Sequence, residues 1–237
     1  MKVTIHATPS IAWQVRRGAF FAEGLKAVGV DVEITSDRFR HDGFPILLGT
    51  TFWKPIENDG GEFLLVDRCS FGDTDKFVQL VRNGHGRRGD HRVARPDDAS
   101  RWEAMGVDLV PWREGNSSVV LCGQIETFSP YFATPDDWYQ VSAEHATHFR
   151  PHPAGLNPTR LPTLLSFDGV GRVLTLNSSI GVKCVLDGIV TECDDEGAMA
   201  FSVSGKQCDR LPWCHWLAWT QWSDDEIREG VPWAYLL

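Results

Sequence analysis

The stretch from residue 149 to residue 199 contains three short polar signatures: Phe-Arg-Pro-His-Pro at 149–153, Asn-Ser-Ser-Ile-Gly at 177–181 and Asp-Asp-Glu-Gly-Ala-Met at 194–199. Each follows a short segment with the pattern of a strand. Between the second and third signatures the pattern changes from a compact helix back to a strand. Strands that alternate with helices predict an α/β fold, in which polar residues gather at the carboxyl ends of parallel strands.

The second signature precedes a predicted helix at 181–188, with Ser179 or Ser178 as its N-cap and Gly188 as its C-terminal stop. The N–H groups and the positive dipole end of such a helix start favour an anionic phosphate. We therefore predict that Ser178 and Ser179 bind phosphate. The alternative is that the two serines only cap the helix.

The first and third signatures add a cation, an imidazole and a carboxylate. His152 stands between two prolines and is predicted to bind a second phosphate oxygen or the nucleoside, with Arg150 beside it. Glu196 and Gly197 follow the next strand, where the carboxylate would accept hydrogen bonds from ribose hydroxyls. Singly, each motif favours a structural role, such as a histidine in a proline turn. The ordered set of three favours a nucleotide site.

Three more residues complete the predicted nucleotide site. Gly123 and Gln124 end a predicted strand at 118–124, where glycine lets the backbone approach a ligand closely. Lys183, within the predicted helix, is a further cation for a phosphate.

The composition is that of a globular protein. The chain has 237 residues and a net charge of −9, which disfavours broad attraction to a polyanion. No apolar run approaches the roughly 20 residues of a membrane span, and the strand-like N-terminus predicts a cytoplasmic protein. The cysteines and histidines lack metal-ligand spacing, so we expect reduced thiols, no metal and no resident cofactor. A monomer is expected.

One basic stretch departs from the acidic balance. Between residues 82 and 95 the only acid is Asp90, whereas the basic residues are Arg82, His85, Arg87, Arg88, His91, Arg92 and Arg95. A small basic patch on an acidic protein can contact a few phosphates. A solvated loop with its counter-charges elsewhere in the fold explains the same pattern equally well.

The chain is predicted to form two α/β halves. Strand patterns alternate with a helix pattern at 10–28 in the first half, and the predicted strands there are 3–7, 30–34, 46–49 and 63–66. A loop-like region at 100–115 precedes the second half. We predict a first domain at 1–115, a second at 116–222 and a C-terminal helix at 223–237.

The C-terminal region is rich in tryptophan. Trp213, Trp216 and Trp219 have a three-residue spacing that places them on one helix face, where core and domain anchoring is the expected role. Ser223 and Glu226 form the pattern of a capping box, which predicts a new helix at 224–229.

With these residues in place, the chain resembles small GT-B-type glycosyltransferases of bacteriophages, several of which act on hydroxymethylated bases in viral DNA. The resemblance covers nearly the full length. It rests on the three signatures and on residues 63–73, 82–86, 100–103, 111–113, 121–124 and 217–222. The His-Pro and Ser-Ser motifs are also similar to those of bacterial sialyltransferases and Kdo transferases, which use CMP-activated sugars.

The resemblance implies two Rossmann-like lobes that face a cleft, with a C-terminal helix that crosses back to the first lobe. The second lobe would hold a nucleotide-sugar cosubstrate of UDP or CMP type, and the first lobe the acceptor. Such enzymes need no divalent metal, because basic groups and a helix start neutralise the leaving phosphate. A phage-borne enzyme of this kind would act in the cytoplasm of its bacterial host.

An inverting transfer requires a general base for the acceptor hydroxyl. Asp67, directly after the predicted strand 63–66, and Asp73 are the candidates, with Asp90 third. Each could instead only cap a turn. A retaining transfer would need no such base, and the sequence leaves both outcomes open.

The predicted acceptor is a 5-hydroxymethylpyrimidine in DNA, flipped out of the duplex. Arg82, Arg87, Arg88 and Arg92 would then contact the DNA backbone. The alternatives are a surface glycan or small-molecule acceptor, and a GT-B module that binds a nucleotide without turnover.

Overall fold

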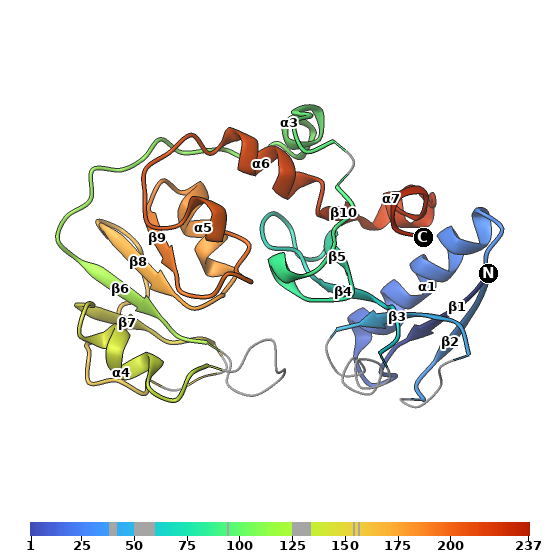
Figure 1. Ribbon diagram of the computed structural model, residues 1–237, viewed down its shortest axis with the longest axis horizontal. Helices are drawn as coiled ribbons and strands as arrows, with labels where there is room; N and C mark the ends of the chain where they lie inside the picture. The colour runs from blue at the N-terminus through green and yellow to red at the C-terminus, as the bar shows by residue number, and fades with distance from the viewer. Residues whose placement is uncertain (38–41, 50–59, 94, 125–133, 154, 156) are drawn as a thin grey trace. The chain divides into compact units, whose positions relative to one another are not determined.

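The computed structural model describes residues 1–37, 42–49, 60–93, 95–124, 134–153, 155 and 157–237. These residues form two compact α/β units (Figure 1). The first unit comprises residues 1–101 and 215–237, and the second unit comprises residues 102–214. Within the described residues, no helix is both long and apolar enough to cross a membrane.

The units divide at other positions than the predicted domain boundaries. The backbone N–H of Val110 donates to Leu186, and that of Arg113 donates to Gly188, so this segment pairs with the second unit. The division near the C-terminus lies within helix α6 (Leu211–Ala218), upstream of residue 223. Hydrogen bonds that the sequence does not reveal therefore assign the segment before residue 116 to the second unit.

The first unit has a six-stranded sheet in the order β10-β5-β4-β3-β1-β2. Its strands are β1 (Lys2–His6), β2 (Asp31–Thr35), β3 (Phe44–Leu48), β4 (Leu64–Arg68), β5 (Phe77–Arg82) and β10 (Gln221–Ser223). The pairs among β2, β1, β3 and β4 are parallel, whereas β5 runs antiparallel to both β4 and β10. The sheet is therefore mixed, with a parallel part that agrees with the predicted strands.

Helices α1 (Ala12–Ala27) and α7 (Asp224–Arg228) contact each other on one face of this sheet (Figure 1). Phe21, Leu25 and Ile227 join them to the hydrophobic core. Three shorter elements complete the unit and its boundary: η2 (Gly86–Arg88), α3 (Ser100–Met105) and α8 (Trp233–Leu236). The C-terminal residues thus pack on the first unit, as the predicted fold requires.

The second unit has a four-stranded sheet in the order β7-β6-β8-β9, with every pair parallel. Its strands are β6 (Val119–Cys122), β7 (His148–Arg150), β8 (Arg172–Thr175) and β9 (Val190–Cys193). Its helices are α4 (Trp138–Ala143), α5 (Ile180–Leu186) and η3 (Phe201–Val203). Gly188 ends α5 with a φ of +79°, as its predicted role as a stop requires.

The structure confirms the predicted capping box in the tryptophan-rich region. The Ser223 hydroxyl accepts a hydrogen bond from the Glu226 N–H, and the Glu226 carboxylate accepts one from the Ser223 N–H. Trp213, in α6, donates to the Met199 carbonyl in the second unit. Trp216, one turn later, stacks edge-to-face on His91 in the first unit. The first residues of α6 therefore belong to the second unit and its last residues to the first unit.

Candidate functional site

The four-stranded sheet reverses its strand order at β6. The chain passes from β6 to β7 on one side, and then from β7 to β8 on the other side of β6. In an open parallel sheet, ligands bind outside the carboxyl ends of the strands at such a reversal. The predicted donor-site residues lie at or after the ends of these four strands: Gly123, Gln124, Arg150, His152, Ser178, Ser179, Glu196 and Gly197.

At the end of β6, the glycine serves the packing of the protein itself. A Cβ atom on Gly123 would lie 2.9 Å from Cζ of Phe149 and 3.0 Å from the backbone N of His152. Gln124 is buried, and its amide donates to the Thr175 hydroxyl at the end of β8 (2.9 Å). Gln124 therefore joins two strand ends.

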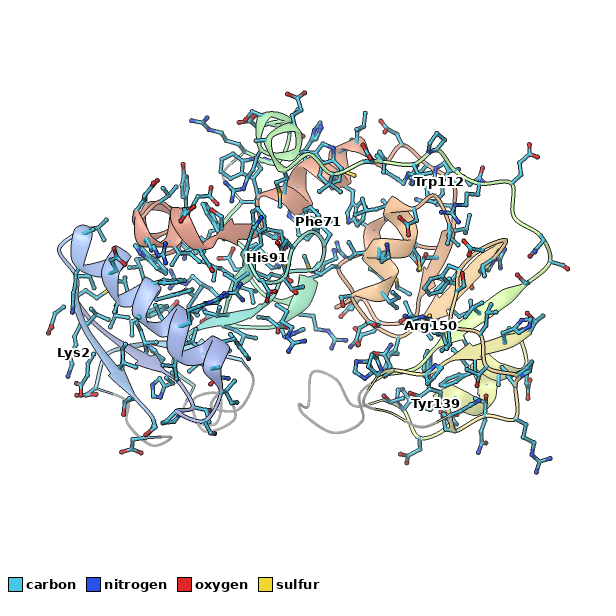
Figure 2. All side chains as sticks on the ribbon, turned by 180° about the vertical axis from the view of Figure 1, so that it is seen from behind. Lys2, Phe71, His91, Trp112, Tyr139 and Arg150 are labelled. Carbon is cyan, nitrogen blue, oxygen red and sulfur yellow. The ribbon has the colours of Figure 1, made fainter. Side chains whose placement is uncertain are left out.

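The last residue of β7 is a cation, Arg150 (Figure 2). The Arg150 guanidinium lies 5.1 Å from the ring centre of Phe167. Its Nε is buried and has no hydrogen-bond partner among the described residues. Burial, and then the charge of Arg150, lower the pKa of His152. At neutral pH this edge therefore presents one cation and one neutral imidazole.

At the end of β8, the two serines have different environments. Ser178 is half-buried, and its hydroxyl accepts a hydrogen bond from the Ile180 N–H at 3.4 Å. Ser179 is exposed at the N-cap position of α5, but its side chain makes no capping hydrogen bond. Ser178 therefore makes the capping hydrogen bond, which is long, and Ser179 presents its hydroxyl to solvent. Lys183 forms an ion pair with Asp187 within the helix (3.1 Å).

The loop after β9 is ordered by an aspartate that the sequence did not single out. Asp195 accepts a hydrogen bond from the Gly197 N–H (2.6 Å) and one from the Asn177 side chain (3.3 Å). It thereby joins the loops after β8 and β9. Glu196 is exposed between these contacts.

Two aromatic residues of α4 also contact this edge, and sequence analysis missed both. The Tyr139 hydroxyl accepts a hydrogen bond from the Gln124 N–H (2.8 Å), and the Trp138 indole donates to Asp194 (2.7 Å). A Trp-Tyr pair in a short helix pattern is the only local signal for them, because their partners lie far away in the sequence.

The two predicted bases of the first unit have different partners. Asp67 lies in β4, and its carboxylate is 2.7 Å from Nε2 of His85. Asp73 is exposed in the turn between β4 and β5, where it accepts from the Asp75 N–H and pairs with Lys76. The contacts of Asp73 are those of a turn-capping residue. Those of Asp67 connect it to a second titratable group.

The structure separates the four arginines predicted to bind DNA. Arg82 is buried and donates to the Leu236 carbonyl (2.9 Å). Arg92 is paired with Asp90 (2.9 Å). Arg87 and Arg88 are exposed in η2. The predicted basic surface is therefore smaller than the sequence indicated, and the side chains of η2 are its most accessible part.

Five of the six cysteine side chains are buried, and that of Cys208 is half-buried. Burial raises the pKa of Cys122 and that of Cys193 to about 12, so both stay protonated at neutral pH. Protonated thiols are poor nucleophiles and poor metal ligands. Across the part of the chain that the structure describes, no three His, Cys, Asp or Glu side chains are grouped to hold a metal ion.

Comparison with known proteins identifies a fold. No family model matches the chain, and no curated protein matches it. Among solved structures, it is similar to KpsC of Thermosulfurimonas dismutans, a beta Kdo 2,7 transferase, with a TM-score of 0.61 and 17% identity. The match covers 98% of this chain and 99% of that chain. The predicted GT-B-like α/β fold is therefore confirmed over nearly the whole length.

Proposed function

We propose that this protein is a glycosyltransferase, which moves a sugar from a nucleotide-sugar donor to a hydroxyl group of an acceptor. The observation that carries the proposal is the full-length likeness to a Kdo transferase, together with the polar side chains at the carboxyl ends of β6–β9. A fold alone supports many functions, so the polar side chains at these strand ends are the more specific support for glycosyl transfer.

In the proposed donor site, the residues at the four strand ends bind different parts of the nucleotide. Arg150 supplies the positive charge for the phosphate of the leaving nucleotide, and the imidazole of His152 binds a phosphate oxygen or the nucleoside. The hydroxyls of Ser178 and Ser179 donate to the same phosphate. Glu196 accepts hydrogen bonds from the ribose. Because protein cations neutralise the leaving group, the proposed transfer is metal-independent.

Two classes of acceptor fit this proposal, and the surroundings of the arginines favour one over the other. A saccharide hydroxyl is the first, because burial of Arg82 and pairing of Arg92 leave a small basic surface. A 5-hydroxymethylpyrimidine in DNA is the second, and the exposed Arg87 and Arg88 support it. In both cases the base for the acceptor belongs to the first unit, where the sequence indicates Asp67 or Asp73.

The test is a transfer assay with a matrix of donors and acceptors. The protein is incubated with UDP- and CMP-activated sugars, including CMP-Kdo, and with oligosaccharides or DNA containing hydroxymethylcytosine or hydroxymethyluracil. Mass spectrometry then detects the addition of one sugar residue. Nucleotide binding by calorimetry without transfer to any acceptor, and without donor hydrolysis, would indicate the non-catalytic module instead.

A further inference from the structure

The first unit has a reversal of strand order of its own, between β1 and β3. The chain passes from β1 through α1 to β2 on one side of β1, and β3 then pairs with the other side of β1. These three strands are parallel, so their carboxyl ends lie at one edge of the sheet. Open α/β sheets bind ligands at such a reversal. The residues that follow β1 and β3 therefore occupy a typical ligand-binding position.

A buried glutamine in the first turn of α1 lies at this edge. Gln14 is only 2% exposed, and its Oε1 accepts a hydrogen bond from the Thr8 N–H in the loop after β1 (2.7 Å). Its Nε2 lies beside Gly49, the residue after β3, where a Cβ atom would be 3.2 Å away from it. Among the described residues, Nε2 has no hydrogen-bond acceptor. The loop therefore fixes one end of the amide, and the other end carries N–H donors without a partner there.

A second buried polar group without a partner lies in the same loop. The hydroxyl oxygen of Thr8 is buried and makes no hydrogen bond within the described part of the chain. Because the Thr8 N–H holds the Gln14 amide, the hydroxyl and the amide belong to one cluster. Burial of a polar group without a hydrogen bond destabilises a folded protein. Two such groups at a reversal of strand order indicate a ligand that supplies the missing partners.

The start of α1 adds backbone donors to the cluster. The helix has 16 residues, its N-cap residue Ile11 makes no side-chain hydrogen bond, and its first turn contains no acidic residue. The Gln14 N–H donates to the Ile11 carbonyl (3.0 Å). The N–H groups of Ala12 and Trp13 come before it and have no acceptor within the helix. These groups and the positive end of the helix dipole favour a negative charge.

The chemistry of the cluster indicates the class of ligand. Its unpaired groups are a primary amide, a hydroxyl and backbone N–H groups, all of which can donate hydrogen bonds. A carboxylate or a phosphate group accepts from all of them and carries the charge that the helix start favours. Arg17, in the next turn of α1, is already paired with Asp224 (3.0 Å), so neutral donors would hold the ligand. Pro9, Ser10 and Ala12 are exposed, which gives a small anion access to the loop.

We propose that the first unit binds a small oxyanion, either a carboxylate or a phosphate group, at the reversal between β1 and β3. The Gln14 amide and the Thr8 hydroxyl donate to its oxygens, together with the N–H groups of Ala12 and Trp13. Gly49 leaves free the space in which a side chain would crowd the Gln14 amide. The inference goes beyond the proposed glycosyl transfer, because this site belongs to the first unit and needs no nucleotide.

The test is a titration of the isotope-labelled full chain with inorganic phosphate, with glucuronate and with neutral glucose, at constant ionic strength. NMR follows the side-chain amide of Gln14 and the backbone amides of Ala12 and Trp13. Gln14→Glu keeps an oxygen that accepts from the Thr8 N–H and replaces the donor with a negative charge. Thr8→Val removes the hydroxyl at nearly constant shape. Gln207→Glu, the same change at an exposed glutamine of the second unit, is the matched control.

We expect phosphate or glucuronate, and not glucose, to shift these signals. Gln14→Glu should abolish the shifts of the two backbone amides, because its charge repels the anion, whereas Gln207→Glu should behave like the wild type. Thr8→Val should weaken anion binding about tenfold, the effect of one lost hydrogen bond. The same variant should raise the Tm of the anion-free protein, because it removes a buried hydroxyl without a partner. A merely structural Thr8 would not show these opposite effects.

The outcomes separate the possible ligands and the possible failures. A response to glucuronate alone supports a carboxylate ligand, and a response to phosphate alone supports a phosphate ligand. Equal responses to glucose and to the anions would overturn the assignment of an anion. The site itself is refuted if no probe shifts the amides of Ala12 and Trp13, or if the shifts persist in Gln14→Glu. If Gln14→Glu does not fold, unchanged anion affinity in Thr8→Val refutes it.

Calorimetry with CMP and UDP tests the second unit separately. A protein that binds an anion at the first sheet but binds no nucleotide would refute the proposed donor site and leave this inference intact. A protein that binds nucleotide but shows no shift at α1 would refute only the inference.

Discussion

The indole N–H of Trp138 donates a hydrogen bond to Oδ2 of Asp194 at 2.7 Å. Trp138 begins the helix that precedes β7, and Asp194 directly follows β9, so the bond joins the start of this helix to the loop after β9, and β7 and β9 are the two outer strands of the four-stranded sheet. The bond thus connects the two sides of the carboxyl edge at which the proposed nucleotide site lies.

Trp138→Phe keeps most of the buried ring and removes this donor. We expect a loss of about 1.5–3 kcal/mol in the free energy of unfolding, the range for a hydrogen bond to a charged group. Urea denaturation measures it. Asp194→Asn is the matched control, because the amide oxygen still accepts the bond and the cost should be smaller. Equal losses in both variants would show that the charge matters more than the contact.

His152→Ala should weaken nucleotide binding by about tenfold, and Ser179→Ala should weaken it less, because each removes one donor to the phosphate. Calorimetry with CMP and UDP measures both. His148→Ala is the control, since His148 begins the strand that His152 follows and lies at its amino end. If affinity is the same in all three variants and wild type, the nucleotide does not bind at these strand ends.

The pH dependence of binding gives a second test of His152. Burial and Arg150 lower its pKa in the protein without ligand, and a bound phosphate favours the protonated ring. Binding must then take up a proton, so nucleotide affinity should rise as the pH falls from 8 to 6. His152→Gln should remove that part of the slope. A pH dependence that persists unchanged in the variant would assign it to the phosphate alone.

His91 should make the protein sensitive to acid. Its ring nitrogens lie 3.0 Å from the Leu80 carbonyl and 2.9 Å from the Gly86 carbonyl, but burial outweighs these contacts and lowers the pKa below 6.5. The unfolded chain therefore binds the proton first, and stability falls as the pH drops below about 6.5. Denaturant melts at pH 8 and pH 5.5 should show a smaller difference in His91→Gln than in wild type.

Gly188→Ala should destabilise the second unit through a steric clash as well as through backbone strain. Its φ is +79°, and a Cβ atom would lie 2.1 Å from the Pro111 carbonyl oxygen. Gly29→Ala is the matched control, because Gly29 has a φ of +77° with nothing within 4 Å of the added atom. The control should lose about 1–2 kcal/mol of unfolding free energy and Gly188→Ala clearly more. Equal losses would mean that the Pro111 segment moves away.

Charge reversal at Arg87 and Arg88 separates the two acceptor classes. If DNA is the acceptor, the double change to Glu should weaken DNA binding and lower the slope of log K against log salt by about 2, since two phosphate contacts are lost. Arg160→Glu, at an exposed arginine of the second unit, is the control. Unchanged DNA affinity in the double variant, with saccharide transfer intact, would remove DNA from the mechanism.

Local patterns predicted the strands and caps, because those depend on residues close in the sequence. The parallel strands, the stop at Gly188 and the capping box at Ser223 all follow from periodicity and single-residue chemistry. Strands β5 and β10 were not predicted. Strand β10 has only three residues, and β5 runs into the basic stretch, whose composition resembles a loop.

The environments of single side chains depended on long-range contacts that no local pattern contains. Arg82 lies in the basic stretch, yet it is buried because its guanidinium binds Leu236, 154 residues later. Asp67 was selected for its place at a strand end, but its partner His85 is brought to it only by the tight loop after β5. The predicted donor residues of the second unit share one sheet edge because strand order, and not spacing, brings them there.

The division of the chain within α6 has a consequence for synthesis on the ribosome. The second unit is continuous in sequence and is inserted into the sequence of the first, so all of its residues leave the ribosome before residues 215–237. Strand β10 and helix α7 belong to that last segment, and without them the first sheet lacks an edge strand and part of its core. The second unit can therefore complete its folding first, while the first unit waits with an open edge until residues 215–237 emerge.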